Sequence, residues 1–214
     1  MKFKKILAYP LVKGESILHI LHIKWLSIFT NLKLDYYNVE HGSCKFFGYT
    51  RITIFKGAKV KIGNNFRALS GREYCVSSND PCKLVVWPGG ELIIGDNVGI
   101  SATSFACKGV IHVGNNVRIG SGCVIHDTDH HSMDPKLRTQ SANGVDAANA
   151  IKKPVIIKDN VFIGARCLIL KGVTIGNNSI IGAGSLVTKD IPDNEIWAGN
   201  PAKFIKKLSV NKEL

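Results

Sequence analysis

Residues 157–174 read Ile157-Lys158-Asp159-Asn160-Val161-Phe162, Ile163-Gly164-Ala165-Arg166-Cys167-Leu168 and Ile169-Leu170-Lys171-Gly172-Val173-Thr174, and these rows decide the fold. The same six-residue spacing runs on to Pro192, and every row opens with Ile or Val. A period of six fits neither a helix, which repeats near 3.6 residues, nor a simple strand, which alternates at about two. The stretch is therefore an internal repeat, which indicates a stacked architecture.

A six-residue period describes a coil with flat sides, in which each side is a short strand and each corner is a sharp turn. Three sides close a turn of about 18 residues, and successive turns stack at roughly 4.8 Å. Corners need residues that tolerate positive φ, which favours glycine and asparagine. The chain supplies such corners at Gly63-Asn64-Asn65, Gly95-Asp96-Asn97, Gly114-Asn115-Asn116 and Gly176-Asn177-Asn178. Because the rows stay in phase, a parallel β-helix is favoured over a sandwich of ordinary strands.

Charge and cysteine content narrow the class of protein. The chain has 214 residues, enough for one domain with its own core, and a formal net charge of +12. Its basic residues are dispersed without a nucleic-acid-binding motif, so we expect no nucleic-acid partner. Six cysteines without a Cys-x-x-Cys spacing predict buried, reduced thiols in a cytoplasmic protein. We expect no secretory signal and, since no apolar run reaches about 20 residues, no membrane-spanning helix.

Residues 1–35 differ from the repeat and predict an amphipathic helical extension. Between Glu15 and Leu32, apolar residues recur at helical spacing after a basic tip. One interpretation is a membrane-surface anchor, which would make the protein peripheral at the inner membrane face. The other is a helix that packs on its own β-helix or on a neighbouring subunit. The sequence leaves both interpretations open.

The β-helix is expected over residues 36–192, followed by a C-terminal extension at 193–214 that contains a short predicted helix. Within the β-helix, the polar stretch Arg67 to Cys82 is predicted to leave the coil. The thirteen-residue step from Ile100 to Val113 exceeds two rows by one residue, which predicts a slip or bulge near residues 106–110. The register vanishes over residues 126–154, so this segment is predicted to be an extruded loop. Long loops in compact folds are often functional.

Three features together go beyond the fold. They are the repeat, the loop segment His131-Ser132-Met133-Asp134, and the ending Ile196-Trp197-Ala198-Gly199-Asn200-Pro201-Ala202-Lys203. With them, residues 90–207 resemble the hexapeptide-repeat O-acetyltransferases, such as the galactoside, maltose and polysaccharide-biosynthesis sugar acetyltransferases. The resemblance implies an all-β, left-handed parallel β-helix, a homotrimer, acetyl-CoA as co-substrate, a carbohydrate acceptor and no required metal. The family commonly has proline where Ser132 stands.

The resemblance implies direct transfer with a histidine as general base. A sugar hydroxyl is a weak nucleophile, and a neutral imidazole can take its proton as it attacks the thioester. His131 matches the family's base, and the adjacent His130 is the alternative. Asp129 and Asp134 complete the predicted catalytic set, and either Asp129 or Asp127 would orient the imidazole or bind the acceptor. A plain surface role for Asp129 and Asp127 stays open.

Coenzyme A is implied to lie in the groove between neighbouring β-helices of the trimer. The cofactor-binding residues carried over by position are Phe162, Gly164, Ala165, Ala183, Thr188, Lys189, Lys203 and Lys206. The small residues among them are also what coil packing requires, and Lys206 is equally well explained as a surface lysine. Trp197 either contacts the adenine or caps the end of the coil. In relatives an asparagine near the acceptor assists catalysis, and the equivalent position in this chain falls near Ser101 to Ser104.

Other functions have to be weighed against sugar O-acetylation. An N-acetyltransferase acting on an amino sugar or an amino acid is the first alternative. A zinc enzyme of the hexapeptide-repeat carbonic anhydrase type would need three histidines across a subunit interface. Its candidates are His112, His126, His130 and His131. A purely structural β-helix would leave the polar loop without a role.

Overall fold

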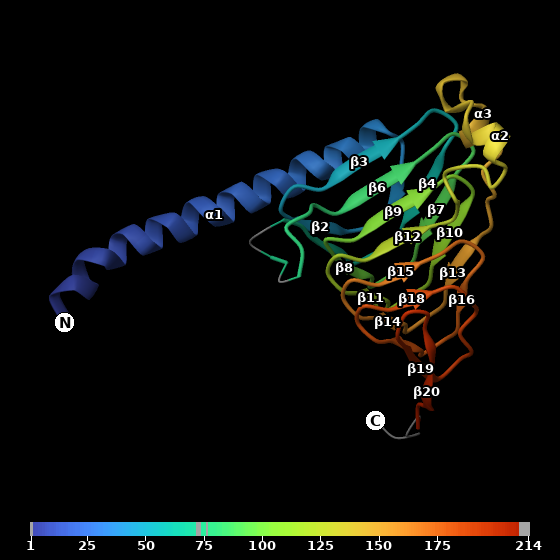
Figure 1. Cartoon of the computed structure of the whole chain (residues 1–214). Helices are drawn as coiled ribbons and strands as arrows, with labels where there is room; N and C mark the ends of the chain where they lie inside the picture. The colour runs from blue at the N-terminus through green and yellow to red at the C-terminus, as the bar shows by residue number, and fades with distance from the viewer. Residues whose placement is uncertain (1, 72–73, 76, 210–214) are drawn as a thin grey trace.

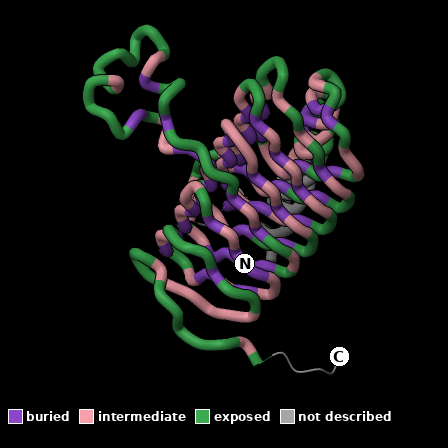
Figure 2. The backbone as a smooth tube through the Cα atoms, turned by 90° about the vertical axis from the view of Figure 1, so that its right-hand side faces the viewer, coloured by how far each residue is buried: buried purple, intermediate pink, exposed green. Residues whose placement is uncertain are grey.

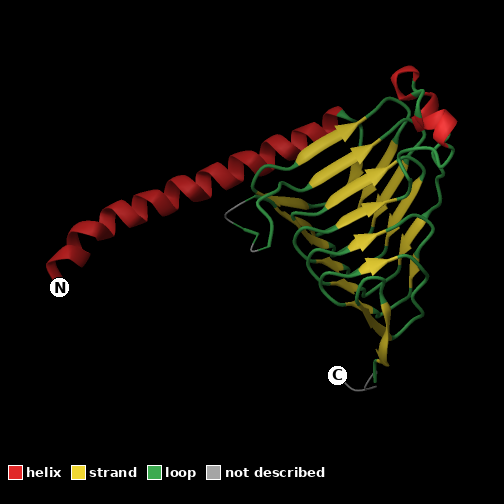
Figure 3. Ribbon diagram, viewed as in Figure 1, coloured by secondary structure: helices red, strands yellow, loops and turns green. Residues whose placement is uncertain are grey.

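The computed structural model describes residues 2–71, 74–75 and 77–209, with side chains from Ile17 onward. The basic tip of the predicted helix and the last residues of the C-terminal extension therefore lie outside the described side chains. A long helix, α1 (Lys2–Tyr36), leads into a three-sided coil that narrows toward the C-terminus (Figure 1). The coil is built of three parallel sheets, one for each side (Figure 3).

Each turn of the coil contributes one strand to each sheet. The first sheet contains β1 (Glu40–His41), β4 (Lys59–Ile62), β7 (Glu91–Ile94), β10 (Val110–Val113), β13 (Val155–Ile157) and β16 (Thr174–Ile175). The second contains β2 (Cys44–Phe47), β5 (Phe66–Leu69), β8 (Gly99–Ser101), β11 (Arg118–Ile119), β14 (Phe162–Ile163), β17 (Ile180–Ile181), β19 (Glu195–Ala198) and β20 (Lys203–Lys207). The third contains β3 (Arg51–Ile54), β6 (Lys83–Val86), β9 (Ser104–Cys107), β12 (Val124–His126), β15 (Leu168–Ile169) and β18 (Leu186–Val187).

The core is a stack of aliphatic side chains that point into the coil. Ile94, Val113, Ile157 and Ile175 follow one another in register on the first sheet, and all four are buried. Figure 2 shows the buried residues running along the inside of the coil. Most early strands of four residues bury two side chains, as β7 does with Leu92 and Ile94, whereas late strands of two residues bury one, as β16 does with Ile175. This difference explains the taper, and the six-residue repeat is confirmed.

The corner between the first and second sheets is held by a ladder of asparagines. Asn97, Asn116, Asn160 and Asn178 all adopt a left-handed backbone, with φ between 57° and 61°. Their side-chain amides bond from one turn to the next at 3.0–3.1 Å. Asparagine serves here because it tolerates positive φ and its amide both donates and accepts. The predicted role of the Gly-Asn corners is confirmed.

Two breaks in the repeat fall close to where the sequence indicates them. Ile100 pairs with Ile119, one residue more than a turn of 18, so the predicted slip between Ile100 and Val113 is confirmed. The prediction that residues 67–82 leave the coil is wrong at its start. Arg67 belongs to β5 and pairs with both neighbouring turns. Side chains alternate between the inside and the outside of the coil along Phe66–Leu69. Phe66 and Ala68 point inward and are buried, so this segment stays in the sheet.

The extruded loop runs from residue 127 to residue 154, between β12 and β13. It contains three short helical segments that the sequence analysis does not predict: α2 (Pro135–Arg138), η1 (Ser141–Asn143) and α3 (Val145–Ala148). Proline at the start of α2 and glycine before α3 are the local signals that set them.

Helix α1 covers the wide end of the coil. It spans nearly the whole of residues 1–35, the predicted helical extension, and its C-terminal half packs against β2. From Ile17 onward, where its side chains are described, the buried residues of α1 are Leu26, Thr30 and Leu34. Within the described residues, no helix is long and apolar enough to span a bilayer.

The helix predicted for the basic segment near the C-terminus is wrong, because residues 195–207 form a β-hairpin. Strand β19 adds to β17 in parallel, and β20 returns antiparallel to β19, pairing Ala198 with Lys203. Helix-forming residues such as Lys206 are overridden by the open sheet edge, which offers backbone partners that a helix would forgo. Trp197 is half-buried against the core and donates its indole N–H to Glu195 at 2.7 Å, which supports its role as an end cap.

Candidate functional site

His131 is held by a buried carboxylate in the extruded loop. Its Nδ1 lies 2.6 Å from Oδ2 of Asp146, which is 2% exposed, whereas the His131 side chain is 68% exposed. The backbone N–H of Ser132 donates to the other carboxylate oxygen at 2.7 Å. The hydrogen bond with His131 has the larger effect and the one from Ser132 the smaller, and together they hold the pKa of the Asp146 carboxyl below its ordinary value. An ionised carboxylate only accepts, so Nδ1 carries the proton and Nε2 presents its lone pair outward.

The second loop histidine has a different environment. His130 packs edge-on against Trp87, with ring centroids 5.8 Å apart, and lies 5.6 Å from the ring of His126. Burial lowers the pKa of the His130 imidazole, and the charge of Lys108 lowers it further. Its backbone has φ of 63°, a left-handed conformation that turns the chain between the two histidines. His130 is therefore packed into the base of the loop, whereas His131 projects from it.

The aspartates predicted from sequence do not touch the His131 imidazole in the described contacts. Asp129 forms an ion pair with Lys171 at 2.7 Å. Asp134 caps α2 by accepting from the Lys136 N–H at 2.8 Å. The predicted orienting partner is thus corrected to Asp146, which sequence reasoning missed. The signal available was an acid within the polar stretch, next to the turn at Gly144.

Asp127 has a structural position. It is fully buried and accepts from the backbone N–H groups of Lys108 and Gly109 at 2.8 and 2.6 Å. It therefore ties the first residues of the loop to the preceding turn of the coil. Burial, together with the charge of Asp127, raises the pKa of the adjacent Cys107 thiol to about 12.

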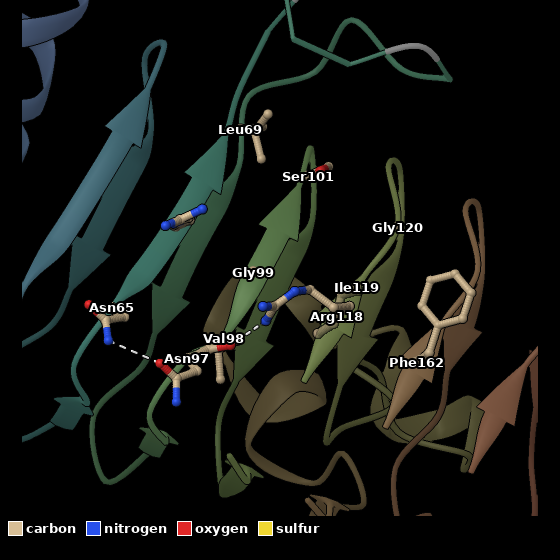
Figure 4. Close-up of a pocket in the computed structure, with 11 residues that line it drawn as sticks. Asn65, Leu69, Asn97, Val98, Gly99, Ser101, Arg118, Ile119, Gly120 and Phe162 are labelled. Atoms are coloured by element: carbon tan, nitrogen blue, oxygen red, sulfur yellow. Dashed lines mark hydrogen bonds between the residues drawn. The ribbon is translucent and has the colours of Figure 1, made fainter. Parts of the chain in front are cut away.

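A groove with a volume of about 640 Å³ lies on the outer face of the second sheet. Figure 4 shows the side chains that line it, with Arg118 on the strand next to that of Phe162 and Ser101 one strand further along the sheet. Arg118 donates to the carbonyl oxygens of Asn97 and Val117. The lining holds two arginines and no acidic residue, so it is electropositive. Two positions singled out in the sequence, Phe162 for the cofactor and Ser101 near the acceptor, therefore meet in one groove.

The small residues predicted for the cofactor line one corner of the coil. Gly164 and Ala165 follow β14, and Ala183 lies on the next turn. A Cβ on Gly164 would stand 2.5 Å from the backbone nitrogen of Ala183, so this glycine is required for the turns to stack. Ala183 is exposed, which leaves the corner open to a ligand. Packing and ligand approach therefore favour the same residues here.

The four predicted polar cofactor residues separate into two places. Thr188 and Lys189 are exposed after β18, at the corner that leads back toward the first sheet. Lys203 and Lys206 are exposed on β20, which extends the second sheet below the groove. The structure therefore groups the β20 lysines with the groove's sheet and leaves the Thr188–Lys189 pair on another corner.

The groove and the loop occupy different parts of the coil. The loop joins the third sheet to the first, whereas the groove lies on the second sheet. In the part of the chain that the structure describes, no group of three His, Cys, Asp or Glu side chains has the arrangement of a metal site.

Comparison with known proteins identifies the repeat. Residues 154–189 match the model for the bacterial transferase hexapeptide, six repeats. The repeat in residues 154–189 is thus of the bacterial transferase hexapeptide type. Over 99 residues the chain is 46% identical to galactoside O-acetyltransferase of Lactococcus lactis, covering 46% of this chain and 44% of that protein. It is 36% identical over 96 residues to a Staphylococcus aureus 2,3,4,5-tetrahydropyridine-2,6-dicarboxylate N-acetyltransferase, covering 45% of this chain and 33% of that protein.

The chain thus spans less than half the length of these two hexapeptide relatives. Its fold is similar to that of AntD, an N-acyltransferase from Bacillus cereus solved with dTDP and 3-hydroxybutyryl-CoA. That likeness has a TM-score of 0.62 at 24% identity and covers 84% of this chain and 88% of AntD. The predicted left-handed parallel β-helix and the predicted hexapeptide-repeat transferase repeat are confirmed.

Proposed function

We propose that the protein is an acetyl-CoA-dependent O-acetyltransferase acting on a carbohydrate acceptor, in the biosynthesis of a surface polysaccharide. The observation that carries the proposal is the pair formed by His131 and Asp146. A buried carboxylate fixes the tautomer of an exposed imidazole, which is the arrangement a general base needs. The match to galactoside O-acetyltransferase supports a sugar hydroxyl as the nucleophile.

In the proposed reaction, Nε2 of His131 takes the proton of the acceptor hydroxyl. The oxygen attacks the carbonyl carbon of the thioester, the carbon–sulfur bond breaks, and the protonated imidazole returns its proton to the coenzyme A thiolate. Asp146 stabilises the imidazolium that forms between these steps. General base catalysis of this kind contributes about 10²–10⁴ in rate.

The proposed site is shared between copies of the chain. Since the loop and the groove lie at different sides of the coil, His131 of one chain would face the groove of its neighbour in a homotrimer. Acetyl-CoA would lie along the groove, past Phe162 and the small-residue corner, with Lys203 and Lys206 near its phosphates. Such a protein would act in the cytoplasm, where acetyl-CoA is available, and would need no metal.

An amino acceptor is the second candidate. The Staphylococcus aureus relative is named as an N-acetyltransferase and AntD as an N-acyltransferase. The same base could deprotonate an ammonium group to the nucleophilic amine, or take the proton that the amine loses after it attacks the thioester. A panel of acceptors that contains matched sugars with hydroxyl or amino groups at one position distinguishes the two.

The test combines binding and transfer. Calorimetric titration with acetyl-CoA is expected to give saturable binding near one ligand per chain. The His131→Ala variant should keep this binding and lose about 10²–10⁴ in transfer rate, followed as free thiol released on adding acceptors. Absence of acetyl-CoA binding by the wild-type protein, or full transfer by His131→Ala, would contradict the proposal.

A further inference from the structure

Helix α1 has two faces, and the inner face of its C-terminal half packs on the coil. Leu26 and Leu34 are buried against the first turn. The backbone N–H of Phe46 donates to Ser27 Oγ at 3.2 Å, and the Asn31 amide donates to the carbonyl of Cys44 at 3.4 Å. This inner face therefore explains why the helix stays attached to the wide end of the coil.

The opposite face of α1 is apolar and exposed. We define the outward stripe as Leu18, Leu21, Trp25, Ile28, Phe29 and Leu32, whose exposed fractions lie between 41% and 69%. Their spacing of three and four residues places them on one side of the helix. The rings of Trp25 and Phe29 stack with centroids 5.5 Å apart. A contiguous exposed apolar surface of this kind marks an interaction site.

The charges around the stripe are basic. Lys24 is exposed beside it, and the Lys33 ammonium lies 5.3 Å from the centroid of the Phe29 ring. In the sequence of α1 as a whole, lysines occur at positions 2, 4, 5, 13, 24 and 33, against only Glu15 and Asp35 as acids. An apolar stripe edged by lysines is complementary to a surface that is apolar inside and negative outside.

We propose that the outward stripe of α1 binds the surface of an anionic lipid bilayer, with the helix lying in the plane of the membrane. Helices with an apolar face rich in Trp, Phe and Leu and basic flanks bind membranes in this way. The helix projects from the coil (Figures 1 and 3), so its free part can lie flat without the coil intervening. No helix among the described residues has the length and apolarity to cross instead.

A second copy of α1 is the other occupant to consider. Paired helices carry complementary charges beside their apolar seam, usually Glu facing Lys. Here lysines dominate the flanks, so two such helices packed side by side would bring like charges together. The charge pattern therefore favours anionic lipid over self-pairing.

The experiment is co-flotation of the full-length protein with vesicles. Phosphatidylcholine vesicles with phosphatidylglycerol are compared with vesicles of phosphatidylcholine alone. We expect the wild-type protein to float with the anionic vesicles and less with the neutral ones. The double variant Trp25→Glu/Ile28→Glu should lower the apparent partition coefficient at least about tenfold, because two large apolar side chains no longer enter the lipid.

Ile20→Glu is the matched control, because Ile20 is 50% exposed on the same helix but lies off the stripe, one turn before Lys24. It should bind within about threefold of wild type, since it removes little surface from the lipid contact. Circular dichroism checks that each variant keeps the β-helix. Failure of the wild-type protein to float, or equal flotation of the stripe variant, would overturn the proposal. So would a stripe variant that changes only the subunit count in sedimentation velocity.

The flotation readout does not use acetyl transfer, so it stands or falls independently of the proposed enzymatic function. A protein that floats but transfers no acetyl group would support the membrane proposal and contradict the proposed acetyltransferase function. A protein that transfers acetyl groups but does not float would support the acetyltransferase function and contradict the membrane proposal.

Discussion

The substitution Asp146→Asn removes one charge and almost no volume from the partner of His131. In the wild-type protein both carboxylate oxygens accept, one from His131 at 2.6 Å and one from Ser132 at 2.7 Å. An amide has only one acceptor oxygen, so its NH₂ group must face one of these two N–H donors. If it faces the imidazole, the proton moves to Nε2 and the outward lone pair is lost.

From this geometry we expect Asp146→Asn to lower kcat about 10- to 10³-fold, a share of the roughly 10²–10⁴ that a general base supplies. The KM for acetyl-CoA should stay unchanged, because the loop carboxylate does not line the groove. The assay is thiol release at saturating acetyl-CoA, with kcat and KM measured separately. Asp134→Asn is the control, because it makes the same chemical change three residues from His131, at the cap of α2.

The refuting result is an Asp146→Asn enzyme with wild-type kcat, or an Asp134→Asn enzyme that loses as much. Stability gives an independent readout. Because the pKa of Asp146 is depressed in the folded protein, its contribution to stability is present above the ordinary carboxyl pKa and is lost as pH falls through the folded value. The difference in Tm between wild type and Asp146→Asn should therefore begin to shrink below about pH 4, the ordinary carboxyl pKa, and vanish only once the pH is below the depressed folded pKa.

Three further predictions follow from other parts of the molecule. Asn116→Ala should lower stability by about 1–3 kcal/mol in urea unfolding, since it loses two ladder bonds and strains φ of 58°, while Asn116→Gly should lose less. The native protein should react slowly with a thiol reagent at Cys107, because burial raises the pKa of its thiol to about 12. Chains with His131→Ala and chains with Arg118→Ala can be co-assembled in equal amounts into mixed trimers. If neighbouring chains share the site, about one quarter of the sites combine an intact His131 with an intact Arg118, so about one quarter of wild-type activity should return. The absence of recovery would contradict a shared site.

The coil could be predicted because each row carries its own signal. An inward aliphatic residue such as Ile163 and a corner residue such as Asn160 both act locally, so the period survives in the sequence. The hairpin after Ile191 could not be predicted in the same way. Its strands form because β17 leaves an open edge for Ile196 to pair with, and that edge exists only once the coil is built.

The candidate site shows the same division. His131 stands in a short motif, so its position was predictable. Asp146 lies fifteen residues later, within a polar stretch whose helical turns carry no hydrophobic period. Only the folding of the loop brings the carboxylate under the imidazole. Asp129, which is nearer in sequence, is instead drawn to Lys171 on the coil. Proximity along the chain is a poor guide within a loop that folds back on itself.

The two ends of the coil explain why α1 can serve two purposes. A stacked repeat exposes apolar surface at each end, and terminal segments must cover it. The hairpin β19–β20 covers the narrow end with Trp197, and the inner face of α1 covers the wide end with Leu26 and Leu34. Covering the end requires only that inner face, so the outward stripe is free of any structural duty. Substitutions at Trp25 and Ile28 can therefore remove a membrane contact while the coil keeps its cap, whereas the same change at Leu34 would uncover the core itself.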